Sequence, residues 1–257
     1  MKRSKIIRTV ISILLAAVFV YSAVQLGLVL HGYEEAKQEY TDIQDEFVVS
    51  TEPAESQITA SGDTAAPKET APIAVDFDKL IKKNEDVVGW IYCENTVINY
   101  PVVQSNSNTE YLKKGLNGKK LSGGTIFADC RNNPIGYDRN YMLYGHNMRN
   151  GTMFGTLTKY KKQSYYDKHP TMYLLTPKGD YKIELVAGKV VSTKEMIYKI
   201  SPDEAAFDSY LEKLCKKSTF KSDVTLEPGD KVITLSTCSY ETENSRYVVV
   251  GKLIPLG

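Results

Sequence analysis

Cysteine, histidine and tryptophan are scarce in this chain: among 257 residues there are four, three and one, respectively. No two cysteines have Cys-x-x-Cys spacing and few histidines could add ligands, so we expect no metal site. The chain also lacks a P-loop and a dinucleotide-binding fingerprint, and we expect no cofactor. A formal net charge of only +1 argues against a dedicated nucleic-acid binder.

The low net charge hides three segments of different composition. Residues 1–33 carry four basic residues and no acidic one, whereas residues 34–75 carry ten acidic and two basic residues. Residues 76–257 are more balanced, with 21 acidic and 26 basic residues. Such a division indicates parts that occupy different environments.

Residues 10–30 form an uncharged stretch whose polar interruptions are Ser12, Ser22 and Gln25. As a helix this stretch would be roughly 30 Å long, the thickness of a bilayer core. The main alternative is a cleaved signal peptide, whose apolar run would be shorter and would end at a small-x-small site. We predict an uncleaved transmembrane signal-anchor. The positive-inside rule then assigns residues 1–9 to the cytoplasm and the rest of the chain to the outside.

Residues 31–75 are predicted to be an extracytoplasmic linker. Their first part, residues 33–47, could form a short charged helix. Residues 50–72 consist mainly of Thr, Ala, Ser, Glu and Pro, with almost no large apolar side chain. Such a segment cannot bury enough surface to offset its chain entropy, so we expect an acidic and flexible tether.

A single β-rich catalytic domain is predicted over residues 76–257. Short runs rich in Val, Ile and Tyr indicate strands, and tyrosine occurs 18 times in the chain. Apolar side chains at helical spacing predict helices over residues 76–84 and 202–217, the second with Ser201 as its N-cap. The expected strands cover residues 87–91, 97–103, 125–128, 141–144, 171–175, 181–191, 231–238 and 247–254.

Cys238 is the cysteine whose position most favours chemistry. It ends the predicted strand 231–238, and Arg246 opens the next strand after a polar connection. If these strands pair as a hairpin, the guanidinium faces the thiol, where it would favour the thiolate and stabilise an oxyanion. His146 also follows a strand, and a Cys with a His is the minimal set for acyl transfer through a thioester. Taken alone, a Cys before a turn, an Arg at a strand edge or a His in a loop is more often structural than catalytic.

The remaining cysteines, Cys93, Cys130 and Cys215, have no spacing that favours a disulfide, although an even count permits two. Cys93 and Cys215 are best interpreted as small buried side chains. The other two histidines are interpreted as structural or surface residues.

These residues resemble a known family. The segment Thr-Leu-Ser-Thr-Cys at 234–238, with Arg246 after it, matches the TLxTC…R signature of sortases, and Gly-His at 145–146 resembles their histidine region. The resemblance covers residues 77–257. Class B is indicated by a helix before the last two strands and by Gly-Trp-Ile at 89–91, Ile-Phe-Ala-Asp-Cys-Arg-Asn at 126–132 and Val-Val-Val-Gly-Lys-Leu-Ile at 248–254.

The resemblance implies both a fold and a location. Sortases are membrane-anchored cysteine transpeptidases of the Gram-positive-type envelope. A closed β-barrel of about eight strands is expected, with N-terminal helices and one helix inserted before the last two strands. The protein would be a single-pass protein of the cell membrane, with its catalytic domain outside the cytoplasm.

The resemblance also implies a reaction. A class B enzyme cuts a C-terminal sorting motif, of Asn/Ser-Pro-x-Thr type, after the Thr of a secreted surface protein. Cys238 would form the thioacyl enzyme, and His146 would protonate the leaving amine and deprotonate the incoming one. Arg246 would hold the substrate and stabilise the oxyanion. An amine of peptidoglycan or its precursor would accept the protein, because a thioester reacts with amines more readily than an amide does.

The resemblance also implies substrate-binding positions, although this chain departs from the family pattern in two places. Ser239 stands where relatives often have an acidic residue, and the connection from Cys238 to Arg246 is shorter than in some relatives. For Leu112 and Ile197, core packing is the alternative role. The substrate-binding positions implied by the resemblance are Asn108, Leu112, Thr193, Ile197, Tyr198, Ser236 and Thr237.

Three other functions fit the sequence less well. L,D-transpeptidases place Gly-Cys next to an Arg and papain-like hydrolases place their Cys at a helix start, and neither pattern fits Cys238. A pilus-polymerising sortase would use a pilin lysine as acceptor, but commonly carries a C-terminal membrane segment, whereas this sequence ends at Gly257. An inactive binding module would not need Cys238, His146 and Arg246 together.

Overall fold

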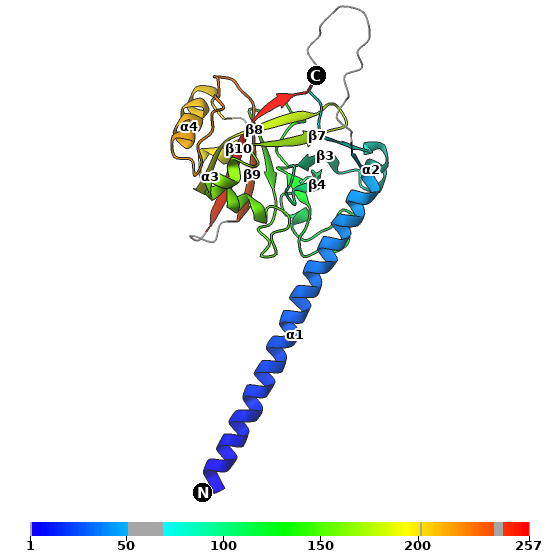
Figure 1. The fold of residues 1–257 in the computed structure, drawn as a ribbon, viewed down its shortest axis with the longest axis vertical. Helices are drawn as coiled ribbons and strands as arrows, with labels where there is room; N and C mark the ends of the chain where they lie inside the picture. Colours follow the sequence, from blue (N-terminus) through cyan, green and yellow to red (C-terminus); the bar gives the residue numbers. More distant parts are fainter. Residues whose placement is uncertain (1, 51–68, 201, 239–243, 257) are drawn as a thin grey trace, which may run out of the picture.

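A single long helix, α1 (Lys2–Phe47), carries the N-terminus well away from the rest of the chain (Figure 1). The computed structural model describes residues 2–50, 69–200, 202–238 and 244–256. Residues 6–30 of α1 are exposed on all sides, and the most apolar window of the helix has a mean hydropathy of 2.4. By length and composition α1 could cross a membrane, where lipid would surround these apolar side chains.

The last turns of α1 pack against the globular part. Ala36, Tyr40, Ile43 and Phe47 are buried, at spacings of three and four residues that define one helix face. Residues 31–47 of the expected linker are therefore helical, and one face of them belongs to the core. The central part of that linker, residues 51–68, lies outside the described residues.

Three short elements lie between α1 and the barrel. Strand β1 (Val48–Ser50) pairs antiparallel with β2 (Ile73–Val75). Helix α2 (Phe77–Lys83) follows, and its N-cap Asp76 accepts a hydrogen bond from the Lys79 amide at 3.1 Å. The predicted helix over residues 76–84 is thus present.

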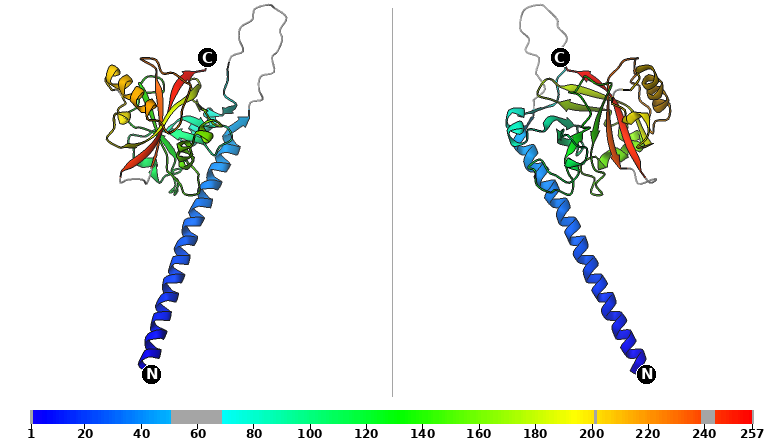
Figure 2. Two further views of the ribbon diagram at one scale, coloured as in Figure 1. Left: turned by 60° about the vertical axis from the view of Figure 1, so that its left-hand side comes forward. Right: turned by 180° about the vertical axis from the view of Figure 1, so that it is seen from behind.

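Eight strands close into a barrel in the order β10-β8-β7-β3-β4-β5-β6-β9. The predicted fold class is confirmed. Two neighbouring pairs, β4 with β5 and β6 with β9, are parallel, and the other pairs are antiparallel. Figure 2 shows from two further sides that the barrel lies at one end of α1. The strands are β3 (Val87–Tyr92), β4 (Asn99–Val103), β5 (Ile126–Ala128), β6 (Asn140–Tyr144), β7 (Thr171–Leu175), β8 (Tyr181–Ser192), β9 (Val232–Cys238) and β10 (Ser245–Pro255).

Helix α4 (Glu204–Lys216) is the predicted insertion before the last two strands. Its N-cap is Asp203, whose side chain accepts from the Ala206 amide at 2.9 Å. The expectation of Ser201 as N-cap is therefore wrong, and Ser201 itself lies outside the described residues. The other short helices are η1 (Glu110–Leu112), η2 (Gly155–Lys161), α3 (Gln163–Tyr166) and η3 (Met196–Tyr198).

The barrel interior and α4 form two hydrophobic clusters. The larger one fills the barrel around Trp90, whose indole N–H donates to Asn99 Oδ1 at 2.7 Å. The smaller one joins α4 to β8, β9 and β10 and includes the fully buried Phe207. All four cysteines are free thiols. Cys93 is fully buried, as the sequence predicted, whereas Cys215 is only partly buried.

Candidate active site

Strand β9 lies between β6 and β10, and this order brings the three predicted catalytic residues to one edge of the barrel. In the parallel β6–β9 pair Tyr144 is opposite Ser236, so His146 and Cys238 each follow two residues later. In the antiparallel β9–β10 pair Arg246 is directly opposite Cys238. The hairpin predicted from the sequence is therefore present, and Cys238 has the histidine strand on one side and the arginine strand on the other.

These residues border a cavity of about 580 Å³ at the barrel edge. All but one of the site residues predicted from the sequence line it. Among the described residues, its charged lining comprises Arg131, Lys194, Lys199 and Arg246 against one acidic residue, Glu195. The lining residues are Asn108, Leu112, Phe127, Arg131, Tyr144, Gly145, His146, Thr193, Lys194, Glu195, Tyr198, Lys199, Ser236, Thr237, Cys238 and Arg246.

Ile197 is the predicted residue that does not line the cavity. Its side chain is fully buried in the smaller hydrophobic cluster, against α4. The assignment of Ile197 as a substrate contact is therefore corrected to core packing. Leu112, for which the same alternative was open, is 37% exposed and faces the cavity.

Several hydrogen bonds fasten the end of β6 to the end of β9. Thr237 Oγ1 donates to the Gly145 carbonyl at 2.9 Å, and the Gly145 amide donates to the Ser236 carbonyl at 3.2 Å. One step further, Asn147 Nδ2 donates to the Cys238 carbonyl at 2.7 Å. The backbone that carries the histidine is thus held in register with the backbone that carries the cysteine.

His146 is oriented by a backbone carbonyl. Its Nε2 lies 2.6 Å from the carbonyl oxygen of Leu112. A carbonyl oxygen only accepts hydrogen bonds, so Nε2 carries the proton in this contact. In the neutral ring Nδ1 is then the nitrogen with a lone pair, and it is the atom that can take up or release a proton.

Tyr198 and Ser236 both line the cavity. The Tyr198 hydroxyl and Ser236 Oγ are 3.0 Å apart. Burial raises the pKa of the Tyr198 phenol, so it remains protonated and able to donate at neutral pH. Arg246, half-buried beside them, donates from Nη1 to the Ser245 carbonyl at 3.0 Å.

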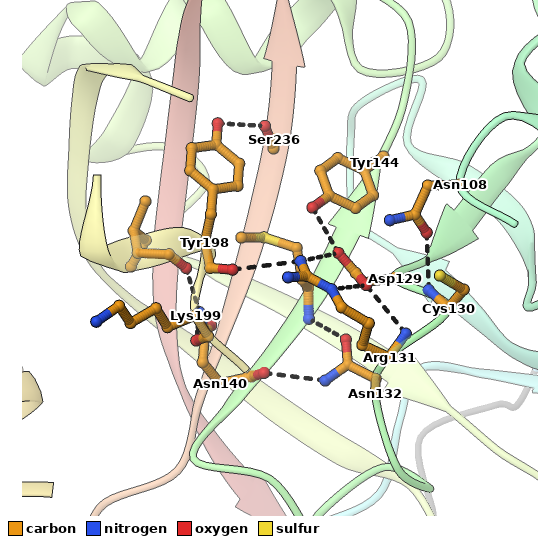
Figure 3. Close-up of polar contacts among 12 residues, drawn as sticks. Asn108, Asp129, Cys130, Arg131, Asn132, Asn140, Tyr144, Tyr198, Lys199 and Ser236 are labelled. Atoms are coloured by element: carbon orange, nitrogen blue, oxygen red, sulfur yellow. Dashed lines mark hydrogen bonds and ion pairs between the residues drawn. The ribbon is translucent and has the colours of Figure 1, made fainter. Parts of the chain in front are cut away.

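A buried carboxylate behind the cavity was not predicted from the sequence. Asp129 is fully buried and accepts from Arg131 Nε at 2.8 Å, from Arg131 Nη2 at 2.7 Å and from the Tyr144 hydroxyl at 2.8 Å (Figure 3). Burial opposes ionisation of Asp129, but hydrogen bonds, foremost those from Arg131, outweigh it and lower its pKa to about 2. Arg131 Nη2 also donates to the Tyr198 carbonyl at 3.3 Å. Asp129 therefore organises two cavity-lining side chains, Arg131 and Tyr144.

Comparison with known proteins identifies the family. The sortase-domain family matches residues 91–254. Sortase B of Listeria monocytogenes is 32% identical over 249 residues, which cover 95% of this chain and 95% of that protein.

Solved structures agree with this relationship. Bacillus anthracis sortase B in complex with AAEK1 is 31% identical, with a TM-score of 0.70 over 88% of this chain and 99% of that one. A Staphylococcus aureus sortase B–substrate complex is 34% identical, with a TM-score of 0.67 over 70% of this chain and 85% of that one. A sortase B complexed with triglycine is also 34% identical, with a TM-score of 0.66 over 70% and 86%. This chain therefore belongs to the sortase family, among the class B enzymes, which are cysteine transpeptidases.

Proposed function

We propose that the enzyme cleaves an Asn/Ser-Pro-x-Thr sorting motif after its Thr and transfers the surface protein to an amine of peptidoglycan or its precursor. The observation that carries the proposal is the β6–β9–β10 register, with His146, Cys238 and Arg246 at the edge of one cavity. The substrate and triglycine complexes of related sortases support a peptide donor and an amine acceptor.

In the first half-reaction His146 takes the proton of the Cys238 thiol, and the thiolate attacks the Thr carbonyl carbon. The tetrahedral intermediate carries an oxyanion that the Arg246 guanidinium stabilises. The C–N bond then breaks as His146 protonates the leaving amine, which leaves a thioester on Cys238. In the second half-reaction the acceptor amine attacks the thioester and gives its proton to His146. The C–S bond breaks, and the thiolate returns with a new amide as product.

The proposed location follows from α1. Residues 10–30 would span the membrane once, with residues 1–9 in the cytoplasm and the catalytic domain, residues 76–257, outside. The exposed apolar surface of this part of α1 supports the span. Because α1 continues to Phe47 and packs on the barrel, residues 36–47 are part of the same folded unit.

The proposal is tested with the full chain in detergent, a quenched fluorescent peptide carrying Asn-Pro-x-Thr, and triglycine. We expect cleavage, and a product in which triglycine is joined to Thr. Cys238→Ala should abolish both, whereas Cys130→Ala, at a half-exposed thiol outside the cavity lining, should retain them. Full activity of Cys238→Ala, or cleavage at a bond other than that after Thr, would refute the proposal.

A further inference from the structure

A lysine-rich hairpin follows η1 directly. Residues 113–121 turn back on themselves through three backbone hydrogen bonds, of 2.8 Å, 3.0 Å and 3.0 Å, and a bridge between Lys114 and Lys120. The two arms of this turn each contribute a pair of lysines. The lysine hairpin therefore concentrates four positive charges, on Lys113, Lys114, Lys119 and Lys120.

Most of this charge is not neutralised within the part of the chain that the structure describes. Lys114 forms an ion pair with Glu110 at 2.6 Å. Lys113, Lys119 and Lys120 are exposed, and none of them forms an ion pair with a carboxylate of the described residues. The lysine hairpin thus presents three exposed ammonium groups to its surroundings.

The lysine hairpin is tied to α1 at the end of the apolar stretch. Ser122, just after the hairpin, donates from Oγ to the Gly32 carbonyl at 2.8 Å. Gly32 lies two residues beyond the proposed span of residues 10–30, or about 3 Å along the helix axis. The headgroup layer on each side of a bilayer is roughly 5–8 Å thick. If α1 spans a membrane, the hairpin lies at the height of the headgroups.

We propose that Lys113, Lys119 and Lys120 bind anionic phospholipid headgroups. The proposal rests on the proposed membrane insertion of α1 and adds a second contact with the membrane. Exposed ammonium groups within a Debye length of an anionic surface are attracted to it. Leu112, whose carbonyl accepts the hydrogen bond from His146, directly precedes Lys113, so the lipid contact would also restrain the loop that orients the histidine.

The test uses the full chain in nanodiscs of phosphatidylcholine, with or without about one third phosphatidylglycerol. Amide hydrogen exchange is measured over residues 113–121. We expect exchange to be about threefold slower or more in the anionic discs. The triple variant K113Q/K119Q/K120Q should lose this difference. The matched variant K168Q/K178Q/K221Q, which removes the same charge at exposed sites elsewhere, should keep it.

Equal exchange of the wild-type hairpin in the two kinds of disc would overturn the lipid contact and leave the membrane span intact. A difference that persists in K113Q/K119Q/K120Q would also overturn it. Failure of the wild-type chain to insert into either disc would overturn the span itself and the lipid contact with it.

Discussion

The three side chains at the end of β9 are held by different kinds of contact. Cys238 is fixed through its backbone, which pairs with β10 and accepts from Asn147. His146 is fixed through its ring, because Nε2 donates to the Leu112 carbonyl. Arg246 is half-buried beside the thiol, and among the described residues its Nη1 contact with the Ser245 carbonyl leaves other donors of the guanidinium for a substrate. In the proposed reaction, proton transfer would use Nδ1 of His146, and anion binding would use Arg246.

Arg246→Lys should be severely impaired, because a lysine keeps the charge but lacks the planar fork of donors. We expect kcat/KM for the sorting peptide to fall by about 10²-fold or more, the size typical of losing one oxyanion donor. Arg149→Lys, at an exposed position outside the cavity lining, is the control. Turnover of Arg246→Lys near that of the wild type would contradict the role given to the guanidinium.

Asp129→Asn should destabilise the fold in a pH-dependent way. The pKa of Asp129 lies at about 2, below its ordinary 3.8, so the carboxylate contributes stability above pH 4 that is lost as the pH falls toward 2. The shift corresponds to about 2 kcal/mol at neutral pH. Urea unfolding from pH 7 to pH 2.5 should show the gap between wild type and variant closing below pH 4. A difference in unfolding free energy that does not change with pH would contradict this role of Asp129. Asp223→Asn, at an exposed side chain, is the control.

The sequence predicted that His146, Cys238 and Arg246 come together, but it did not predict what surrounds them. Cys238 and Arg246 are recognisable because they end and begin adjacent strands, so local pairing is enough to bring them together. Asp129 and Arg131 stand in a segment that already pointed to class B, but their role depends on Tyr144 and Tyr198, which come from distant parts of the chain. Ile197 was misassigned because an apolar residue on a cavity wall and one in the core look alike in sequence.

Among the elements, the parallel β6–β9 pair is the one that brings His146 to the same end of the barrel as Cys238. The pairing joins residues about 90 positions apart, as the separation between Gly145 and Thr237 illustrates. Strand existence could be predicted from runs of Val, Ile and Tyr, whereas parallel pairing and barrel closure depend on non-local contacts that such runs do not encode. The packing of the end of α1 is also a non-local contact. Its acidic composition suggested a linker, but one face of this part of the helix is buried against the barrel.

Gly145→Ala tests the close packing at the end of β6. A Cβ at this position would lie 2.5 Å from Ile126 Cδ1 and 2.7 Å from the Phe154 ring. We expect a loss of about 1–3 kcal/mol in unfolding free energy and a fall in kcat larger than any change in KM, because the histidine is displaced. Adding Ile126→Val, which removes the methyl in closest contact, should restore part of both. Wild-type kcat and thermal midpoint in Gly145→Ala would contradict this packing.

At the scale of the whole molecule, one continuous helix links a candidate membrane span to the catalytic barrel (Figure 1). Tyr40 anchors this helix to the barrel by donating to the Gly124 carbonyl and by edge-on packing against Tyr100, with ring centroids 5.1 Å apart. The segment from Leu112 to Gly124 therefore has one end at the active site and the other on α1. The barrel edge would accordingly be held at a fixed height above the membrane.

In the proposed reaction, Cys238 carries the acyl group between donor and acceptor. The most direct measurement is the intact mass of the full chain after rapid mixing with an Asn-Pro-x-Thr peptide in the absence of an added amine, followed by mapping of the modified residue. We expect a mass increase equal to the peptide fragment that ends in Thr, located on Cys238 and removed when triglycine is added. Peptide cleavage without any adduct, or an adduct on Cys130 instead, would contradict the claim.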